Sequence, residues 1–184
     1  MDLSHSQQGV LIALLRILPL ATATTSGVFS YLSHEYVAGF KHRDVTYEAR
    51  SATLPGWWIH IRPLSLVVIW GSFIPSFILG VLNANNSTIF GLLGDGSRGV
   101  VGPLASRLYL IGGIVSIAYF AQTVARGFVP LQLNVMMVAK QPAAKREAAL
   151  DKFLRMDFVR GWTAGFPVFV LFLAATTAWV ADQL

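Results

Sequence analysis

The stretch GWTAGFPVFVLFLAATTAWV, residues 161–180, contains no charged side chain in 20 residues. A helix needs about 20 predominantly apolar residues to cross the hydrocarbon core of a bilayer. Pro167 lies inside the stretch, but membrane helices tolerate proline when neighbouring groups satisfy the freed carbonyl. The stretch therefore predicts a membrane-spanning helix near the end of the chain.

Three earlier stretches have the same character, at about 9–33, 57–83 and 104–126. The whole chain has 184 residues, of which 54% are hydrophobic and only 12% charged, whereas a soluble domain carries about 25% charged residues. Too little polar surface remains to cover a globule in water. We therefore predict an all-α integral membrane protein, a single domain over 1–184 built as an up-down bundle of four transmembrane helices.

The segment 140–160, before the last span, is amphipathic. Leu150, Phe153, Leu154 and Phe158 recur at helical spacing between charged residues. We expect an amphipathic helix that either lies on the membrane surface or extends the fourth span.

Basic residues in short links predict the orientation, because Lys and Arg are retained on the cytosolic side. The first and third links together hold nine of them, whereas Arg98 stands alone on the opposite side. We expect luminal termini and cytosolic first and third links, with overlapping glycosylation sequons at Asn85 and Asn86 on the luminal side. The nine basic residues are Lys41, Arg43, Arg50, Lys140, Lys145, Arg146, Lys152, Arg155 and Arg160.

The net charge of +5 does not predict nucleic-acid binding, because the basic residues flank apolar spans and no nucleic-acid-binding motif is present. The chain has no cysteine, which excludes disulfides and thiolate metal sites. The expected partners are membrane lipid and an apolar small molecule, and a homo-oligomer remains open.

Ionisable residues at membrane depth are costly and are therefore functional candidates. In an up-down bundle the cytosolic ends of the four spans lie close together. Most of the ionisable residues at membrane depth are near this end. We predict a polar mouth there with a tryptophan rim, because the space between bundle helices is a common place for a pocket. The residues concerned are His34, Glu35, His60, Arg62, Arg126, Gln132, Asn134, Asp157 and Arg160, with Trp57, Trp58 and Trp162 at the rim.

Each candidate has a structural alternative. His60 is either a general base, since histidine has an ordinary pKa near 6.5, or a neutral hydrogen-bonded side chain. His60 and Arg62 face opposite sides of a helix unless Pro63 opens its start. Arg62 alternatively snorkels to headgroups, and Arg126 anchors its span. Asp157 and Arg160 are three residues apart and share one helical face, where an ion pair would neutralise both.

A metal site is a weaker hypothesis. Two histidines and a carboxylate bind iron in many oxygenases, and His34, Glu35, His60 and Asp157 could supply such a set. No motif of fixed spacing such as H-E-x-x-H is present. We therefore expect no metal.

The topology and the last third of the chain resemble the DUF1772 family, which includes the fungal anthrone oxygenases of aromatic polyketide pathways. Pro130 precedes Gln132 and Asn134 after the third span, and Phe153, Asp157 and Arg160 follow at intervals of four and three. Phe153 stands where the family usually has tryptophan, and Asp157 where it has histidine or asparagine. A member with these differences would act on a related pathway intermediate.

The resemblance implies oxidation of an anthrone-like phenol to a quinone, with O₂ as co-substrate and no organic cofactor, in the endoplasmic reticulum. Under it His60 is the base, Arg160 the oxyanion partner, and Asn134 and Asp157 orient them. An aromatic slot would hold the flat substrate, with further contacts from Arg62, Arg126 and Gln132. The slot residues are Trp57, Trp58, Trp162 and Phe166.

Two other functions remain open. A cofactor-free membrane isomerase or cyclase would use the same mouth for proton transfer and would not need oxygen. A non-enzymatic, claudin-like scaffold would tolerate replacement of His60 and Arg160.

Overall fold

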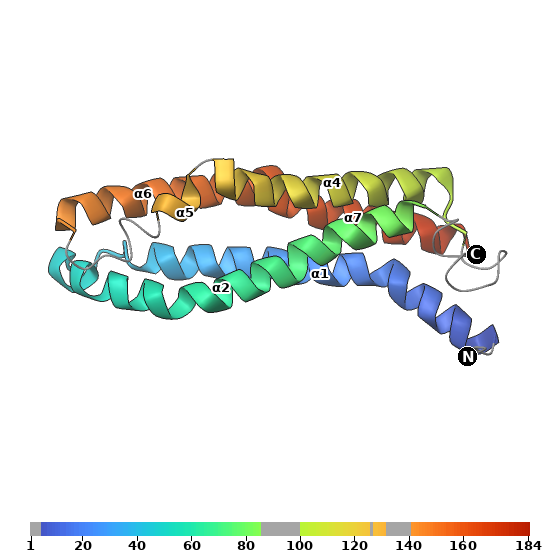
Figure 1. Ribbon diagram of the computed structural model, residues 1–184, viewed down its shortest axis with the longest axis horizontal. Coiled ribbons are helices and arrows are strands. Elements are labelled where there is room, and N and C mark those ends of the chain that lie inside the picture. Colours follow the sequence, from blue (N-terminus) through green and yellow to red (C-terminus); the bar gives the residue numbers. More distant parts are fainter. Residues whose placement is uncertain (1–4, 86–99, 126, 132–140) are drawn as a thin grey trace.

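The computed structural model describes residues 5–85, 100–125, 127–131 and 141–184, and every regular element within them is helical. Among these described residues, four helical stretches are long and apolar enough to cross a membrane: Gln7–Gly39, Tyr47–Ala84, Pro103–Gln122 and Ala143–Ala181. The predicted all-α, four-span fold class is confirmed. In chain order the elements are α1 (His5–Gly39), α2 (Tyr47–Ala84), α4 (Pro103–Ala125), α5 (Phe128–Leu131), α6 (Ala143–Arg160), the π-helical turn η2 (Gly161–Gly165) and α7 (Phe166–Ala181) (Figure 1).

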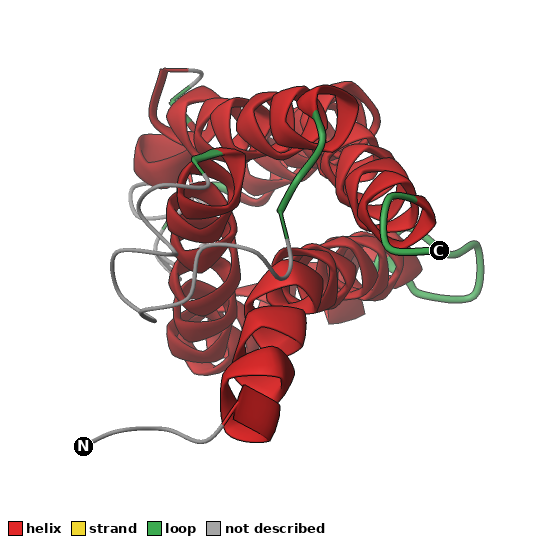
Figure 2. Cartoon of the chain, turned by 90° about the vertical axis from the view of Figure 1, so that its right-hand side faces the viewer, coloured by secondary structure: helices red, strands yellow, loops and turns green. Residues whose placement is uncertain are grey.

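The long helices run alternately up and down and close into a ring (Figure 2). α1 packs against α2, α2 against α4, α4 against α7, and α7 against α1. The outer surface of the bundle carries many large apolar side chains, and Leu14, Val67 and Ile114 are examples. Such a surface suits lipid as the solvent.

The amphipathic segment extends the fourth span rather than lying flat on the membrane. α6, η2 and α7 form one continuous helical path from Ala143 to Ala181. The apolar face of α6 is buried, with Leu150 and Phe153 packed against Trp58 of α2 and Val37 of α1. This packing explains why the segment stands upright beside the other helices.

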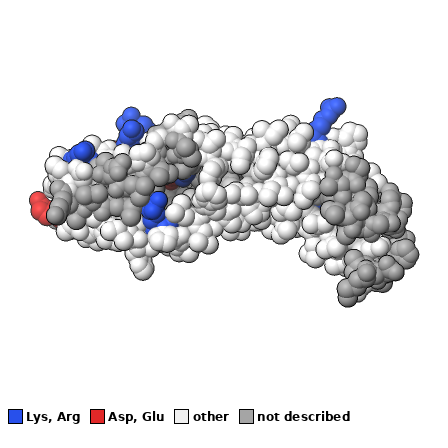
Figure 3. Space-filling model, in the orientation of Figure 1, with Lys and Arg blue, Asp and Glu red and all other residues white. Residues whose placement is uncertain are grey.

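The helices are longer than a bilayer is thick. α1 has 35 residues and α2 has 38, so at about 1.5 Å per residue each exceeds the hydrocarbon thickness of about 30 Å. Ion pairs gather at the end formed by the α1–α2 loop and α6, where Lys41 contacts Glu147 and Asp151 and Arg50 lies 3.1 Å from Glu147. Basic side chains cluster at this end in Figure 3. This end therefore projects from the hydrocarbon.

A buried polar network ties the helices together near the opposite end. Arg16 is fully buried, and its Nη1 donates to the backbone carbonyl of Asn83 at 2.9 Å and to the Asn83 side-chain oxygen at 3.1 Å. The Tyr109 hydroxyl donates to the Arg16 carbonyl at 2.8 Å. The network joins α1, α2 and α4, so Arg16 packs between helices and does not snorkel to the surface.

α2 and α4 approach each other at glycines. A Cβ added at Gly80 would lie 2.7 Å from the Tyr109 carbonyl oxygen and 2.8 Å from the Gly113 Cα. Small residues permit this close contact between membrane helices, where packing drives association.

Replacing Gly80 with alanine should destabilise the bundle by about 1–3 kcal/mol, because the methyl group meets backbone atoms that cannot move aside. Thermal unfolding of the detergent-solubilised chain measures this. Gly71→Ala on the same helix is the matched control, since a Cβ there meets no heavy atom of the described chain within 4 Å. Equal unfolding temperatures for the two variants would contradict the close approach of α2 and α4.

Candidate functional site

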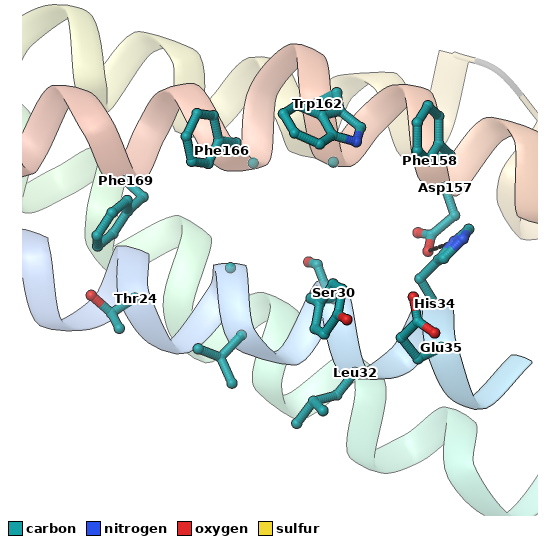
Figure 4. Close-up of a pocket in the computed structure, with 15 residues that line it drawn as sticks. Thr24, Ser30, Leu32, His34, Glu35, Asp157, Phe158, Trp162, Phe166 and Phe169 are labelled. Carbon is teal, nitrogen blue, oxygen red and sulfur yellow. Dashed lines mark hydrogen bonds and ion pairs between the residues drawn. The ribbon is translucent and has the colours of Figure 1, made fainter. Parts of the chain in front are cut away.

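A groove of about 620 Å³ runs between α1 and the continuous helix α6–η2–α7 (Figure 4). This volume lies in the range of about 300–1,000 Å³ that is usual for small-molecule sites. The described residues that line it are Thr24, Gly27, Val28, Ser30, Tyr31, Leu32, His34 and Glu35 from α1, and Asp157, Phe158, Gly161, Trp162, Gly165, Phe166 and Phe169 from the other wall.

The groove opens on the outer surface of the bundle. Its rim carries large exposed apolar side chains, among them Tyr31 (65% exposed), Trp162 (60%) and Phe166 (53%). These residues lie on helices that are long and apolar enough to cross a membrane, so their exposed apolar faces suit contact with lipid. A molecule dissolved in the bilayer can therefore reach the groove from the side.

One end of the groove is polar. His34 Nδ1 lies 3.3 Å from Asp157 Oδ2, and Arg160 pairs with Oδ1 of the same carboxylate. The Asp157 side chain is only 3% exposed, so this ion pair is buried. The spacing of three residues on α6 brings Asp157 and Arg160 together, as the sequence predicted.

Side chains from the neighbouring helices support the Asp157–Arg160 ion pair. The Arg160 guanidinium carbon lies 4.5 Å from the centroid of the Tyr119 ring, within the range of a cation–π contact. The buried Tyr119 stacks on Phe73 with centroids 3.9 Å apart, and its hydroxyl is 2.8 Å from the Ser30 hydroxyl. Groups from α1, α2 and α4 thus hold the charged pair of α6 in place.

The π-helical turn lies directly beside the groove. The Phe166 amide donates to the Gly161 carbonyl, five residues back, and this widens the turn. Pro167 favours the irregularity, because it has no N–H for the carbonyl of Thr163. Single π turns inside helices are frequent at functional sites. Here the turn follows Asp157 and Arg160 and carries Trp162 into the groove wall.

The structure brings together some of the predicted site residues. Asp157, Trp162 and Phe166 line the groove, together with His34 and Glu35, which the sequence placed in the polar mouth and among the metal candidates but gave no catalytic role. Arg160 does not line it, because its guanidinium lies between Asp157 and Tyr119. Arg160 therefore holds Asp157 and is not part of the groove lining, and its predicted role as oxyanion partner stays a prediction.

The candidates on α2 lie elsewhere. His60 is exposed and does not line the groove, and the partly buried Arg62 does not line it either. Trp58 is buried in the core of the α6 end with its ring 4.9 Å from Phe153, and Trp57 stacks on Trp58 at 5.0 Å. We therefore do not assign these four residues to the site. Arg126, Gln132 and Asn134 lie outside the described residues, as do both sequons apart from Asn85.

Sequence reasoning missed Ser30 and Tyr119. They lie 89 positions apart in two apolar spans, so no local pattern joins them. One signal was available on α1, where Gly27, Ser30 and His34 follow each other at intervals of three and four and therefore share a helical face.

The four residues named as weaker metal candidates do not form one cluster. His34, Glu35 and Asp157 line the same end of the groove, but His60 does not join them. Among the residues that the structure describes, no group of three or more His, Asp or Glu side chains is arranged to hold a metal ion.

Comparison with known proteins adds one relative. The chain is 27% identical over 168 residues to "Probable epoxidase scpX" of Mollisia scopiformis, a similarity that covers 90% of this chain and 95% of the other. No family model matches the chain, and no solved structure matches it. The resemblance to DUF1772 therefore stays a prediction, whereas the similarity to a protein described as a probable epoxidase extends over nearly the full length.

Proposed function

We propose that this membrane protein is an enzyme that oxidises an apolar small molecule with O₂ in the groove between α1 and α7. The observation that carries the proposal is the His34–Asp157–Arg160 arrangement at the polar end of an otherwise apolar groove. The full-length similarity to a protein described as an epoxidase supports the oxidative class.

His34 is the general base. An ionised Asp157 can only accept a hydrogen bond, so Nδ1 of His34 donates to it and Nε2 keeps a lone pair. A base whose second nitrogen is held by a carboxylate is oriented for proton transfer. Arg160 is a positioning residue, because it neutralises and holds Asp157 from behind.

The substrate class that fits this chemistry has an acidic C–H or O–H bond beside an aromatic ring, as an anthrone-like phenol has. His34 removes a proton, and the resulting electron-rich carbanion or phenolate transfers electrons to O₂. A CH₂ group becomes a carbonyl, one atom of O₂ enters the product and the other leaves as water. Because the substrate supplies all the electrons, no organic cofactor is required.

Epoxidation is the second candidate, because the relative carries that name. An alkene also takes one oxygen atom from O₂, but two electrons for the other atom must come from a separate reductant. The acid–base pair in the groove favours a substrate that can be deprotonated.

The oxygen dependence of turnover tests the proposal. Membranes that contain the chain should convert anthrone to anthraquinone in air, and with isotopically labelled O₂ the label should enter the new carbonyl. Conversion should stop under nitrogen and should survive a chelator. Turnover without oxygen would contradict the proposal and indicate an isomerase or cyclase, and loss with chelator would point to a metal. A requirement for an added reductant with an alkene substrate would favour epoxidation.

We further propose an endoplasmic reticulum location with luminal termini. The basic residues gathered at the end formed by the α1–α2 loop and α6 support this orientation, because Lys and Arg favour the cytosolic side.

A further inference from the structure

The groove is polar at one end and apolar along the rest of its length. His34, Glu35 and Asp157 stand at one end, and Thr24 and Phe169 at the other (Figure 4). The walls between them carry mainly aromatic and aliphatic side chains. A molecule that fills the groove would therefore need one polar end and a long apolar body.

The length of the groove matches one leaflet of a bilayer. On α1 the lining runs from Thr24 to Glu35, and a helix rises by about 1.5 Å per residue, which makes about 16 Å. Half of a hydrocarbon core of about 30 Å is about 15 Å. The groove can hold a single chain that reaches from the membrane surface to the bilayer centre.

The polar end lies where the hydrocarbon ends. The apolar run of α1 stops at His34 and Glu35, and the apolar run of the last span begins at Gly161, just after Asp157 and Arg160. Charged side chains are costly at the centre of the membrane, so these residues lie near its surface. The Thr24 end consequently lies deeper in the hydrocarbon.

We propose that the substrate is a single-tailed amphiphile of the leaflet nearest the α1–α2 loop, which enters sideways with its head at His34 and its tail toward Phe169. This inference rests on the proposed function. The polar and apolar ends of the groove then lie at the same depths as the head and tail of such a molecule in the bilayer. The substrate then need not carry its polar head through hydrocarbon, where an unpaired polar group is costly.

The charges at the polar end restrict the head group. The Glu35 carboxylate lines the groove beside the Asp157 carboxylate, whose charge Arg160 balances. A second anion at this place would be repelled. The head is therefore a neutral hydrogen-bond donor such as a phenol, not a carboxylate or a phosphate.

Glycine leaves room for the tail. A Cβ added at Gly27 on α1 would meet no heavy atom of the described chain within 4 Å, and the same is true of Gly161 on the opposite wall. A larger side chain at Gly27 would extend into the groove without a clash. This position offers a way to block the tail and leave the fold intact.

Two photoreactive para-dodecylphenols test the orientation in phosphatidylcholine vesicles that contain the full chain. One carries a diazirine at the tail end and the other carries it beside the ring, and mass spectrometry locates the crosslinks. The tail probe should label the Thr24–Val28 region and Phe169, and the ring probe the Tyr31–Glu35 region. Reversed order would overturn the proposal, as would equal labelling of a lipid-facing residue such as Val67 of α2. The wild-type chain suffices for this measurement.

Two controls sharpen the test. Gly27→Leu should lower labelling of Phe169 by the tail probe about tenfold, which corresponds to about 1.4 kcal/mol. Gly71→Leu on α2 should leave labelling unchanged, because Gly71 also has open space but lies outside the groove. A dodecanoic acid with the same tail diazirine should label the groove more weakly than the phenol does. Equal labelling would refute the neutral head group.

The two proposals fail separately. Ordered labelling in a chain that oxidises nothing would refute the proposed function and leave the head-to-tail binding orientation in the groove standing. Oxygen-dependent turnover with reversed or unordered labelling would do the opposite.

Discussion

His34→Gln lowers oxygen-dependent turnover by about 10²–10⁴-fold, the contribution that a positioned general base makes. Glutamine keeps a polar side chain beside Asp157 but cannot take up a proton at neutral pH. The His34 side chain is 24% exposed at the groove and lies outside the apolar core, so the variant should fold. The initial rate in vesicles, measured with and without oxygen, gives the effect.

His42→Gln is the matched control, because His42 lies in the exposed α1–α2 loop with 62% of its side chain accessible. It should turn over as the wild type does. If His34→Gln kept its rate while His60→Gln lost it, the base would be the α2 histidine and the groove would not be the reaction site.

Arg160→Met should cost about 3–5 kcal/mol of stability, because it leaves the Asp157 carboxylate buried without its ion-pair partner. Methionine also loses the cation–π contact with Tyr119. Denaturant unfolding in detergent micelles measures the change. Arg155→Met is the matched control, since Arg155 is exposed on the same helix.

The double variant Asp157→Asn/Arg160→Met separates stability from activity. Removal of both charges should restore most of the stability, because no buried charge remains unpaired. Turnover should stay low, because a neutral amide does not stabilise the protonated His34 as a carboxylate does. A double variant with wild-type turnover would show that the ion pair serves only the fold.

The sequence alone determined the features that depend on hydrophobic length and on short spacing. Runs of about 20 apolar residues predicted four helical spans, because a helix of this length crosses the hydrocarbon core and satisfies its backbone groups within the segment. A spacing of three residues predicted the contact between Asp157 and Arg160. The apolar residues of the last span that follow this pair, Trp162 and Phe166, were likewise expected at the site, and both line the groove.

Only the tertiary structure decided which histidine joins this pair. The sequence places both His34 and His60 near the same end of the predicted bundle. Hydropathy predicts which residues form a span, but it does not predict how that helix is rotated about its axis. Packing set that rotation: α1 lies against α7 and turns His34 toward Asp157, whereas His60 remains exposed on α2. The contact between Ser30 and Tyr119 could not be predicted for the same reason. A hydrogen bond between helices far apart in the sequence depends on how each helix is rotated and how deep it lies, and no local sequence pattern gives either.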